Sequence, residues 1–186
     1  LDSHLLSDLK NGKLPLFEPH LDELVHQMVK GGMLSFESDC DKAVASADIV
    51  LVTYDTPVDD QDQVDLSVIE NTLLKSMAHL RSNALVVINS QVPVGSCERW
   101  QEIVDQKRPQ DKIDVICSPE NIRLGQAIEC FKNPDMIILG ACTERARKKA
   151  AEFYHNFESE KFFVSLKTAE MAKHALNVFF ATSISF

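Results

Sequence analysis

Five short apolar runs divide the chain and predict buried β-strands. Their residues are mainly Val, Ile and Leu or Phe, without a regular alternation of apolar and polar positions. They lie at 48–54, 83–90, 113–118, 136–140 and 161–166. Strands that lack polar alternation are buried on both faces, which is typical of a parallel sheet covered by helices.

Helical spacing of apolar residues separates these runs. In the first helical segment, Leu21, Leu24 and Met28 share one face, and the pair Gly31-Gly32 ends the pattern. Asp65 is a candidate cap for the segment that follows it. Helices are predicted at 19–32, 38–47, 66–80, 95–107, 143–158 and 168–186. Strands that alternate with helices predict an α/β fold with a doubly wound, Rossmann-like parallel sheet, whose binding sites lie at the carboxyl ends of the strands.

Composition narrows the classes of function. The chain has 186 residues, is 45% hydrophobic and carries a net charge of -9. Its 19 basic residues are scattered among 28 acids, so no basic stripe favours a nucleic-acid partner. The five cysteines have no metal-like spacing, so we expect no metal site and reduced thiols. No apolar run reaches the roughly 20 residues of a membrane helix, and we expect a cytoplasmic protein without membrane contact.

Three strand ends combine a small hydroxyl residue with a proline. These loops are 54–57, 90–95 and 118–121. Proline restricts its own backbone and that of the preceding residue, so each loop is expected to be stiff. Each loop alone is explained better by an ordinary βα turn. Together, at one edge of a sheet, the three are explained equally well by such turns and by the wall of a site for a ligand rich in oxygen atoms.

The last helix is apolar almost all round except for Glu170, Lys173 and Asn177. At 100° per residue these three fall within about 60° of one another. Two interpretations stay open: an internal pair between Glu170 and Lys173, or a polar stripe that faces a ligand cavity. His20 and His174 are interpreted as ordinary surface or core histidines, because neither has a partner at metal spacing.

Five longer stretches carry a family resemblance. They are "LKNGKLPLFEPHLDELV", "DIVLVTYDTP", "NSQVPVGS", "SPENIRLGQAIECFKNPDMIILG" and "TAEMAKHALNVFFATSISF". In order and spacing the chain resembles the UDP-glucose/GDP-mannose dehydrogenases, which use NAD to oxidise the C6 alcohol of a nucleotide sugar to a carboxylate. The third and fourth stretches are long and unusual enough to make the resemblance specific.

The resemblance implies roles for particular residues. Glu120 matches the family's catalytic acid/base, while Lys173 and Asn177 match the lysine and asparagine that stabilise a developing oxyanion. A cation and an amide directed at such an oxygen are what this chemistry needs. For the cofactor NAD, the matching residues are Thr56, Pro57, Ser90, Gln91, Val92 and Leu124. For the nucleotide sugar, the matching residues are Glu120, Asn121, Ile122, Arg123, Lys173 and Asn177.

The resemblance also has gaps. In the family a Gly-rich turn that cradles the cofactor pyrophosphate comes before this region, and the nucleophilic cysteine comes after it. We therefore expect a fragment truncated at its N-terminus: a partial NAD-binding domain over 1–166 and the start of a central connecting helix over 167–186. Gln91 replaces a threonine that helps to hold a water, and Leu124 replaces a glutamate beside the nicotinamide. Tyr54-Asp55 replaces Val-Gly or Val-Asn.

The sequence is compatible with three functions. The first is an internal fragment of a nucleotide-sugar 6-dehydrogenase, inactive by itself, whose full-length parent forms a homodimer through the apolar central helix. The alternative is a non-catalytic binding or regulatory module derived from the family, which the substitutions at Gln91 and Leu124 would suit. A dehydrogenase of hydroxy acids would share Lys and Asn on a central helix, but it gives no reason for "SPENIRLG".

Overall fold

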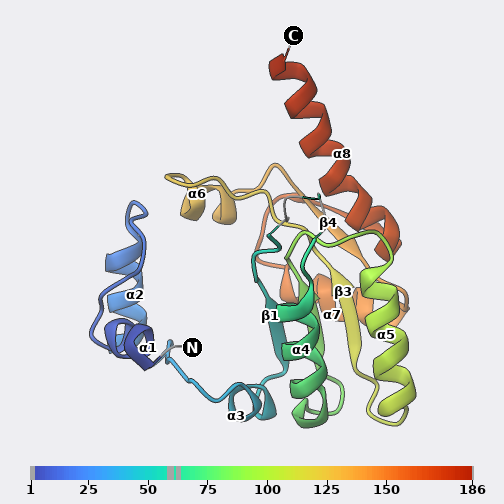
Figure 1. Ribbon diagram of the computed structural model, residues 1–186, viewed down its shortest axis with the longest axis horizontal. Coiled ribbons are helices and arrows are strands. Elements are labelled where there is room, and N and C mark those ends of the chain that lie inside the picture. Colours follow the sequence, from blue (N-terminus) through green and yellow to red (C-terminus); the bar gives the residue numbers. More distant parts are fainter. Residues whose placement is uncertain (1–2, 58–60, 62–63, 186) are drawn as a thin grey trace.

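A computed structural model describes residues 3–57, 61 and 64–185, and its centre is a five-stranded sheet (Figure 1). The strands follow one another across the sheet in chain order. They are β1 (Ile49–Val52), β2 (Leu85–Ile88), β3 (Asp114–Cys117), β4 (Met136–Gly140) and β5 (Glu160–Val164). Each strand coincides with a run predicted from the sequence to within two residues at its start.

The sheet is mostly, but not entirely, parallel. β1, β2 and β3 run in the same direction, and β4 and β5 are parallel to each other. β3 and β4 are antiparallel and pair Cys117 with Gly140, so the prediction of a wholly parallel sheet is wrong at this pair. A parallel neighbour needs a crossover that returns the chain along the sheet, usually a helix packed on its face. The link from β3 to β4 contains only the short helix α6 (Ala127–Lys132), which lies beyond the sheet rather than across it (Figure 1).

The other helices cover the sheet or extend from it. They are α1 (Ser3–Lys10), α2 (Leu21–Lys30), α3 (Cys40–Ala45), α4 (Ser67–Ser76) with the 3₁₀ turn η1 (Met77–His79), α5 (Ser96–Lys107), α7 (Glu144–Phe153) and α8 (Leu166–Ser185). The six predicted helices are present, whereas α1 and α6 were not predicted. α6 has six residues, too few to show an apolar period.

Both faces of the sheet are buried at the central strands β2 and β3, which explains the missing polar alternation there. Val86 and Ile88 belong to a core layer that includes Trp100 of α5. The alternate residues of the same strand, Leu85 and Val87, belong to a second layer with Ala150 of α7. Successive side chains of a strand point to opposite faces, so each residue of β2 meets a helical layer.

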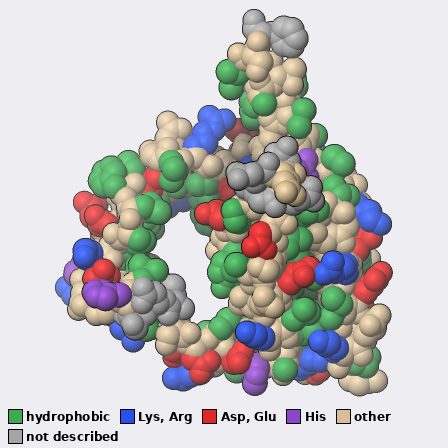
Figure 2. All heavy atoms as spheres, in the orientation of Figure 1, with side chains coloured by type: hydrophobic (Ala, Val, Ile, Leu, Met, Phe, Trp, Pro, Cys, Tyr) green, Lys and Arg blue, Asp and Glu red, His purple; other side chains and the backbone are tan. Residues whose placement is uncertain are grey.

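Two parts of the molecule extend away from the sheet. α1 and α2 stand to one side of it, across an opening bordered by hydrophobic side chains (Figures 1 and 2). The second half of α8 projects past the sheet (Figure 1) and exposes Val178, Phe179 and Ile184. Despite this apolar end, the described residues contain no helix that meets the length and hydropathy needed to cross a membrane. The division into two domains after residue 166 stays a prediction.

A buried carboxylate fastens α7 to the amino end of β3. Asp114 is 1% exposed and accepts hydrogen bonds from Arg145 at 2.7 and 2.8 Å and from Lys149 at 2.9 Å. Burial by itself would raise the pKa of Asp114, but the bonds from Arg145 and Lys149 outweigh it and hold the pKa below its usual value. The carboxylate therefore contributes stability above the pKa of an unfolded aspartate, and this contribution is lost as the pH falls through the lower folded pKa.

We predict that Asp114→Asn lowers the free energy of unfolding at neutral pH by about 3 kcal/mol, because two cations lose their buried partner. The difference from wild type should shrink below about pH 4, where the unfolded carboxylate begins to protonate, and should vanish as the pH falls through the lower pKa of the native carboxylate. Urea unfolding followed by the fluorescence of Trp100, the single tryptophan, measures both effects. Asp135→Asn, at an exposed aspartate just before β4, is the matched control. Equal stability of the Asp114 variant and the control would contradict the prediction.

Candidate functional site

Two strand-end loops meet at the carboxyl ends of β1 and β2. The hydroxyl of Thr56 donates to the carbonyl oxygen of Gln91 at 2.7 Å. The hydroxyl of Ser90, which is buried, donates to the carbonyl oxygen of Val52 at 3.3 Å. Both hydroxyls are therefore used to hold the loops against each other. Pro57 follows Thr56 and is exposed, so the structure brings Thr56, Ser90 and Gln91 together at this edge.

The third loop, after β3, is fastened to the second. The side-chain amide of Asn89 donates to the carbonyl oxygen of Ser118 at 2.6 Å, and the backbone N–H of Ser118 donates to Ile88 at 2.9 Å. The loops after β1, β2 and β3 thus form one continuous wall, as their shared pattern of hydroxyl residue and proline suggested.

Glu170 of α8 settles one alternative that the sequence left open. Its side chain is 2% exposed and accepts the backbone N–H of Gly95 at 2.5 Å and of Cys97 at 2.8 Å. Among the described residues no ion pair joins Glu170 to Lys173. The carboxylate instead caps the start of α5, where Gly95 has a positive φ of 99° that turns its N–H toward α8.

The other two members of the stripe reach different loops. The ammonium of Lys173 lies 3.5 Å from the side-chain oxygen of Asn121, in the loop after β3. The side-chain amide of Asn177 donates to the side-chain oxygen of Gln91 at 2.9 Å, in the loop after β2. α8 therefore brings Lys173 and Asn177 to the wall formed by the strand ends.

His174 belongs to the same arrangement, and its half-buried, hydrogen-bonded ring is compatible with its interpretation as an ordinary surface or core histidine. Its Nε2 lies 2.9 Å from the carbonyl oxygen of Val92, and its Nδ1 lies 3.1 Å from the side-chain nitrogen of Gln91. No local pattern marked this residue, because its partners are more than 80 positions away in the chain.

The loop that carries Glu120 is less tightly joined to α8. A carboxylate oxygen of Glu120 accepts the backbone N–H of Ile122 in its own loop. No hydrogen bond or ion pair among the described residues joins Glu120 to Lys173. Ile122, Arg123 and Leu124 are exposed, and 85% of the surface of Leu124 is accessible to solvent. Among the described residues, no polar contact joins Leu124 to the loops that are expected to hold NAD.

Glu18 anchors the far end of this loop. It is 5% exposed, and its two oxygens accept the backbone N–H groups of Gly125 and Ala127, each at 2.7 Å. Gly125 has a positive φ of 82°, so the geometry repeats that of Glu170 and Gly95. Glu18 was not predicted as a functional residue, since its partners lie 107 and 109 positions away.

Three helices that begin near this edge each have a carboxylate at their start. Asp65 accepts the N–H of Ser67 at 2.8 Å at the start of α4, as predicted for a cap. Glu170 and Glu18 do the same for α5 and α6. A free helix N-terminus attracts phosphate, but a bound carboxylate satisfies its N–H groups. Anionic ligands at this edge would therefore depend on side-chain cations.

Two of the cysteines are too deeply buried to offer a nucleophile. Cys97 and Cys117 are buried. A hydrogen bond with Cys117, together with burial, raises the pKa of the Cys97 thiol well above its usual value, so this thiol stays protonated and unreactive. No group of three or more potential metal-ligating side chains occurs in the part of the chain that the structure describes.

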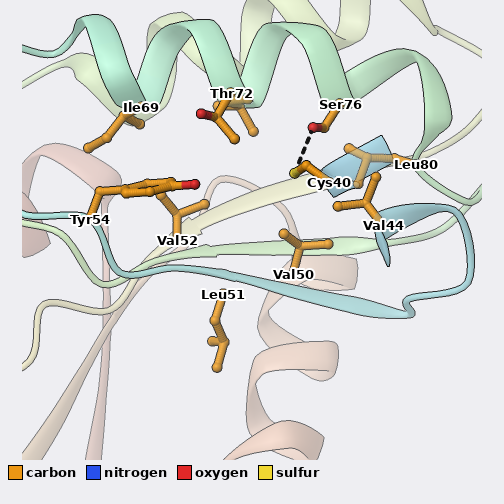
Figure 3. Close-up of a pocket in the computed structure, with 11 residues that line it drawn as sticks. Cys40, Val44, Val50, Leu51, Val52, Tyr54, Ile69, Thr72, Ser76 and Leu80 are labelled. Atoms are coloured by element: carbon orange, nitrogen blue, oxygen red, sulfur yellow. Dashed lines mark hydrogen bonds between the residues drawn. The ribbon is translucent and has the colours of Figure 1, made fainter. Parts of the chain in front are cut away.

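An apolar cavity of about 80 Å³ lies between β1, α3 and α4, beside the first loop (Figure 3). Tyr54 borders it with Ile69 and Thr72 of α4, and Cys40 contacts Ser76 at 3.2 Å within its wall. Leu51 points the other way (Figure 3). The candidate catalytic residues on α8 do not line this cavity.

Comparison with known proteins identifies the family. Residues 1–158 match the NAD-binding domain of the UDP-glucose/GDP-mannose dehydrogenase family. The chain belongs to the UDP-glucose/GDP-mannose dehydrogenase family. It is 37% identical over 191 aligned residues to the UDP-glucose 6-dehydrogenase of Rhizobium meliloti, which covers all of this chain and 44% of that protein.

Solved structures of UDP-glucose/GDP-mannose dehydrogenases have the same fold. A UDP-glucose dehydrogenase from Pyrobaculum islandicum has a TM-score of 0.92 and 31% identity, and a GDP-mannose dehydrogenase from Pseudomonas aeruginosa has a TM-score of 0.91 and 25% identity. Each covers the whole of this chain and 44% of the solved chain. The chain therefore spans less than half the length of these family members.

We predict that Glu18→Gln and Glu170→Gln loosen different loops. A glutamine keeps one acceptor oxygen but cannot accept both N–H groups, and hydrogen bonds to a charged group contribute about 1.5–3 kcal/mol. In Glu18→Gln, hydrogen exchange at Gly125 and Ala127 should accelerate roughly tenfold or more, while Gly95 and Cys97 stay protected. Glu170→Gln should give the reverse.

Amide hydrogen exchange measured residue by residue by NMR tests both variants. Glu23→Gln, at a carboxylate of α2 that is 80% exposed, is the matched control and should change neither loop. The capping roles are refuted if both variants leave all four amides as protected as in wild type.

Proposed function

We propose that this chain is the NAD-binding part of a nucleotide-sugar 6-dehydrogenase, which oxidises the C6 alcohol of a UDP- or GDP-sugar to a carboxylate in two hydride transfers. The observation that supports this most directly is the convergence of Lys173, Asn177 and the loop of Glu120 at the carboxyl edge of the sheet. The related proteins that bear this activity in their names support it over the whole chain.

The described residues fit one end of the cofactor. NAD, when bound, supplies the hydride acceptor. Thr56, Pro57 and the backbone of 90–92 form a stiff surface at the adjacent carboxyl ends of β1 and β2, the place where doubly wound sheets hold dinucleotides. Because the starts of α4, α5 and α6 carry carboxylates, we assign the pyrophosphate to none of them. Leu124 is the least supported cofactor contact, since its apolar side chain offers no hydrogen bond.

The three catalytic candidates would divide the proton and charge chemistry. Glu120 would take and return protons at the reacting oxygen or at water. Its carboxylate accepts a backbone N–H of its own loop and no other hydrogen bond from the described residues. Lys173 would place a positive charge beside the developing oxyanion, and Asn177 would donate an amide N–H to it. The weak contact between Lys173 and Asn121, at 3.5 Å, leaves the ammonium easy to redirect toward substrate.

The substrate phosphates need cations in a chain with a net charge of -9. Arg123 is exposed in the loop after β3, close in sequence to Glu120. A guanidinium can bind phosphate oxygens through two parallel hydrogen bonds. We assign Arg123 to the diphosphate, and Asn121 and Ile122 to the side of the sugar.

The projecting end of α8 supports a homodimer in the full-length protein. Residues 178–185 contain no charged side chain. The hydroxyls of Thr182, Ser183 and Ser185 donate to helix carbonyl oxygens four residues earlier. Because these hydroxyl protons are already bonded within the helix, they do not need water as a partner. The resulting apolar surface, with Phe179 and Ile184 at 65% and 85% exposure, is of the kind that oligomers bury.

Two departures from the family pattern favour the second candidate, a binding or regulatory module without catalysis. The side chain of Gln91 already accepts a hydrogen bond from the amide of Asn177, and Leu124 has no charge where the family has a glutamate. Such a module would bind NAD or the nucleotide sugar without turnover, so one assay of binding and rate separates the two candidates.

We predict that Glu120→Gln and Lys173→Ala each lower kcat of the full-length gene product by roughly 10² to 10⁴, because proton transfer and oxyanion stabilisation have contributions of this size. The measurement is NADH formation from NAD with UDP-glucose, GDP-mannose and UDP-N-acetylmannosamine. Lys167→Ala is the matched control. Its side chain begins on the same helix but pairs with Glu98 at 2.6 Å, and it should keep the wild-type rate.

If both variants retain wild-type turnover on the preferred sugar, the catalytic roles are wrong. Binding of the sugar without any turnover in the wild-type protein would support the non-catalytic module instead.

A further inference from the structure

Four groups form a directed chain of hydrogen bonds between α8 and the loop after β2. Asn177 contacts Gln91 at 2.9 Å, Gln91 contacts His174 at 3.1 Å, and His174 contacts the carbonyl oxygen of Val92 at 2.9 Å. Gln91 and His174 are half-buried, which shields the two hydrogen bonds of His174 from water.

The last member of the chain fixes the direction of every bond. A backbone carbonyl oxygen can only accept, so Nε2 of His174 must carry a proton and donate it to Val92. In the neutral ring Nδ1 then has a lone pair and no proton. It accepts from the side-chain N–H of Gln91, which turns the oxygen of Gln91 toward Asn177. That oxygen accepts the N–H of Asn177.

The consequence lies at Asn177. An unrestrained asparagine can exchange the places of its oxygen and its nitrogen by rotating its side-chain amide. Here Gln91 holds the nitrogen, so the oxygen and the second N–H of Asn177 have fixed positions. Among the described residues no other polar contact engages this side chain. The chain of hydrogen bonds therefore presents the amide of Asn177 in one orientation to the candidate site.

We propose that His174 is a positioning residue, which in its Nε2-protonated neutral form sets the orientation of the Asn177 amide through Gln91. The hydrogen-bond chain stands on the geometry alone. The effect of this hydrogen-bond chain on catalysis rests on the proposed function. The hydrogen-bond chain and its catalytic effect are therefore tested in separate experiments, and the test of the hydrogen-bond chain uses no substrate.

The first experiment is NMR of the 186-residue chain with labelled histidine and asparagine. We expect the ring nitrogens of His174 to show a protonated Nε2 and an unprotonated Nδ1. His174→Phe, which keeps a ring but loses both nitrogens, should shift the side-chain amide signals of Asn177. Gln91→Met should shift them similarly, and the double variant should add nothing. His174→Gln, which retains a donor and an acceptor, should partly restore the wild-type signals.

His155→Phe is the matched control, because that histidine contacts a backbone oxygen of α7, away from α8. The proposal is overturned by a protonated Nδ1 in His174, or by Asn177 signals that do not respond to His174→Phe while the fold is intact. An intact fold is judged from unchanged backbone amide signals of β2 and β3.

The second experiment measures rates in the full-length gene product. We expect His174→Phe to lower kcat about tenfold, equivalent to about 1.4 kcal/mol, with little change in KM for NAD. In the background of Asn177→Ala it should add nothing, since it acts through that residue. Additive losses would overturn the positioning role. If no sugar is oxidised by the wild-type protein, the proposed function fails and the NMR result decides the hydrogen-bond chain by itself.

Discussion

The arrangement of the site depends on two buried carboxylates that each bind a pair of backbone N–H groups. Glu170 reaches from α8 to Gly95 and Cys97, and Glu18 reaches from the segment before α2 to Gly125 and Ala127. A buried carboxylate is costly unless it is hydrogen-bonded, and the N–H groups at a helix start need acceptors. The buried carboxylates and the free N–H groups satisfy one another, so both loops are held by groups that are distant in the chain.

This constraint also shapes what the edge of the sheet can recognise. With the starts of α4, α5 and α6 already bonded to carboxylates, backbone N–H groups and helix dipoles contribute little to binding an anion. Under the proposed function, recognition of an anionic ligand would fall to the side chains of Lys173 and Arg123. Side-chain cations can move toward a ligand, whereas the stiff loops around them stay in place. The site thus combines a fixed wall with adjustable charges.

Much of this was accessible from the sequence. The five strands, the helices other than α1 and α6, and the family resemblance followed from apolar runs, periodicity and extended motifs, because these signals are local. The antiparallel pair β3 and β4 was not predicted, since strand direction depends on where the connecting segment travels in space. Glu18 and His174 were missed for a related reason. Their partners lie more than 80 residues away, and nothing in the neighbouring residues distinguishes them from surface side chains.

By itself, the sequence determined which residues are the candidates for the chemistry: a glutamate after the third strand and a lysine and an asparagine on one face of the last helix. The tertiary structure alone decided which groups each of them meets. The polar stripe of α8 looked like a single unit in the sequence, but its members contact α5, Asn121 and Gln91 separately. Periodicity fixes the face on which a side chain lies, while the packing of the helix against three different loops selects its partner.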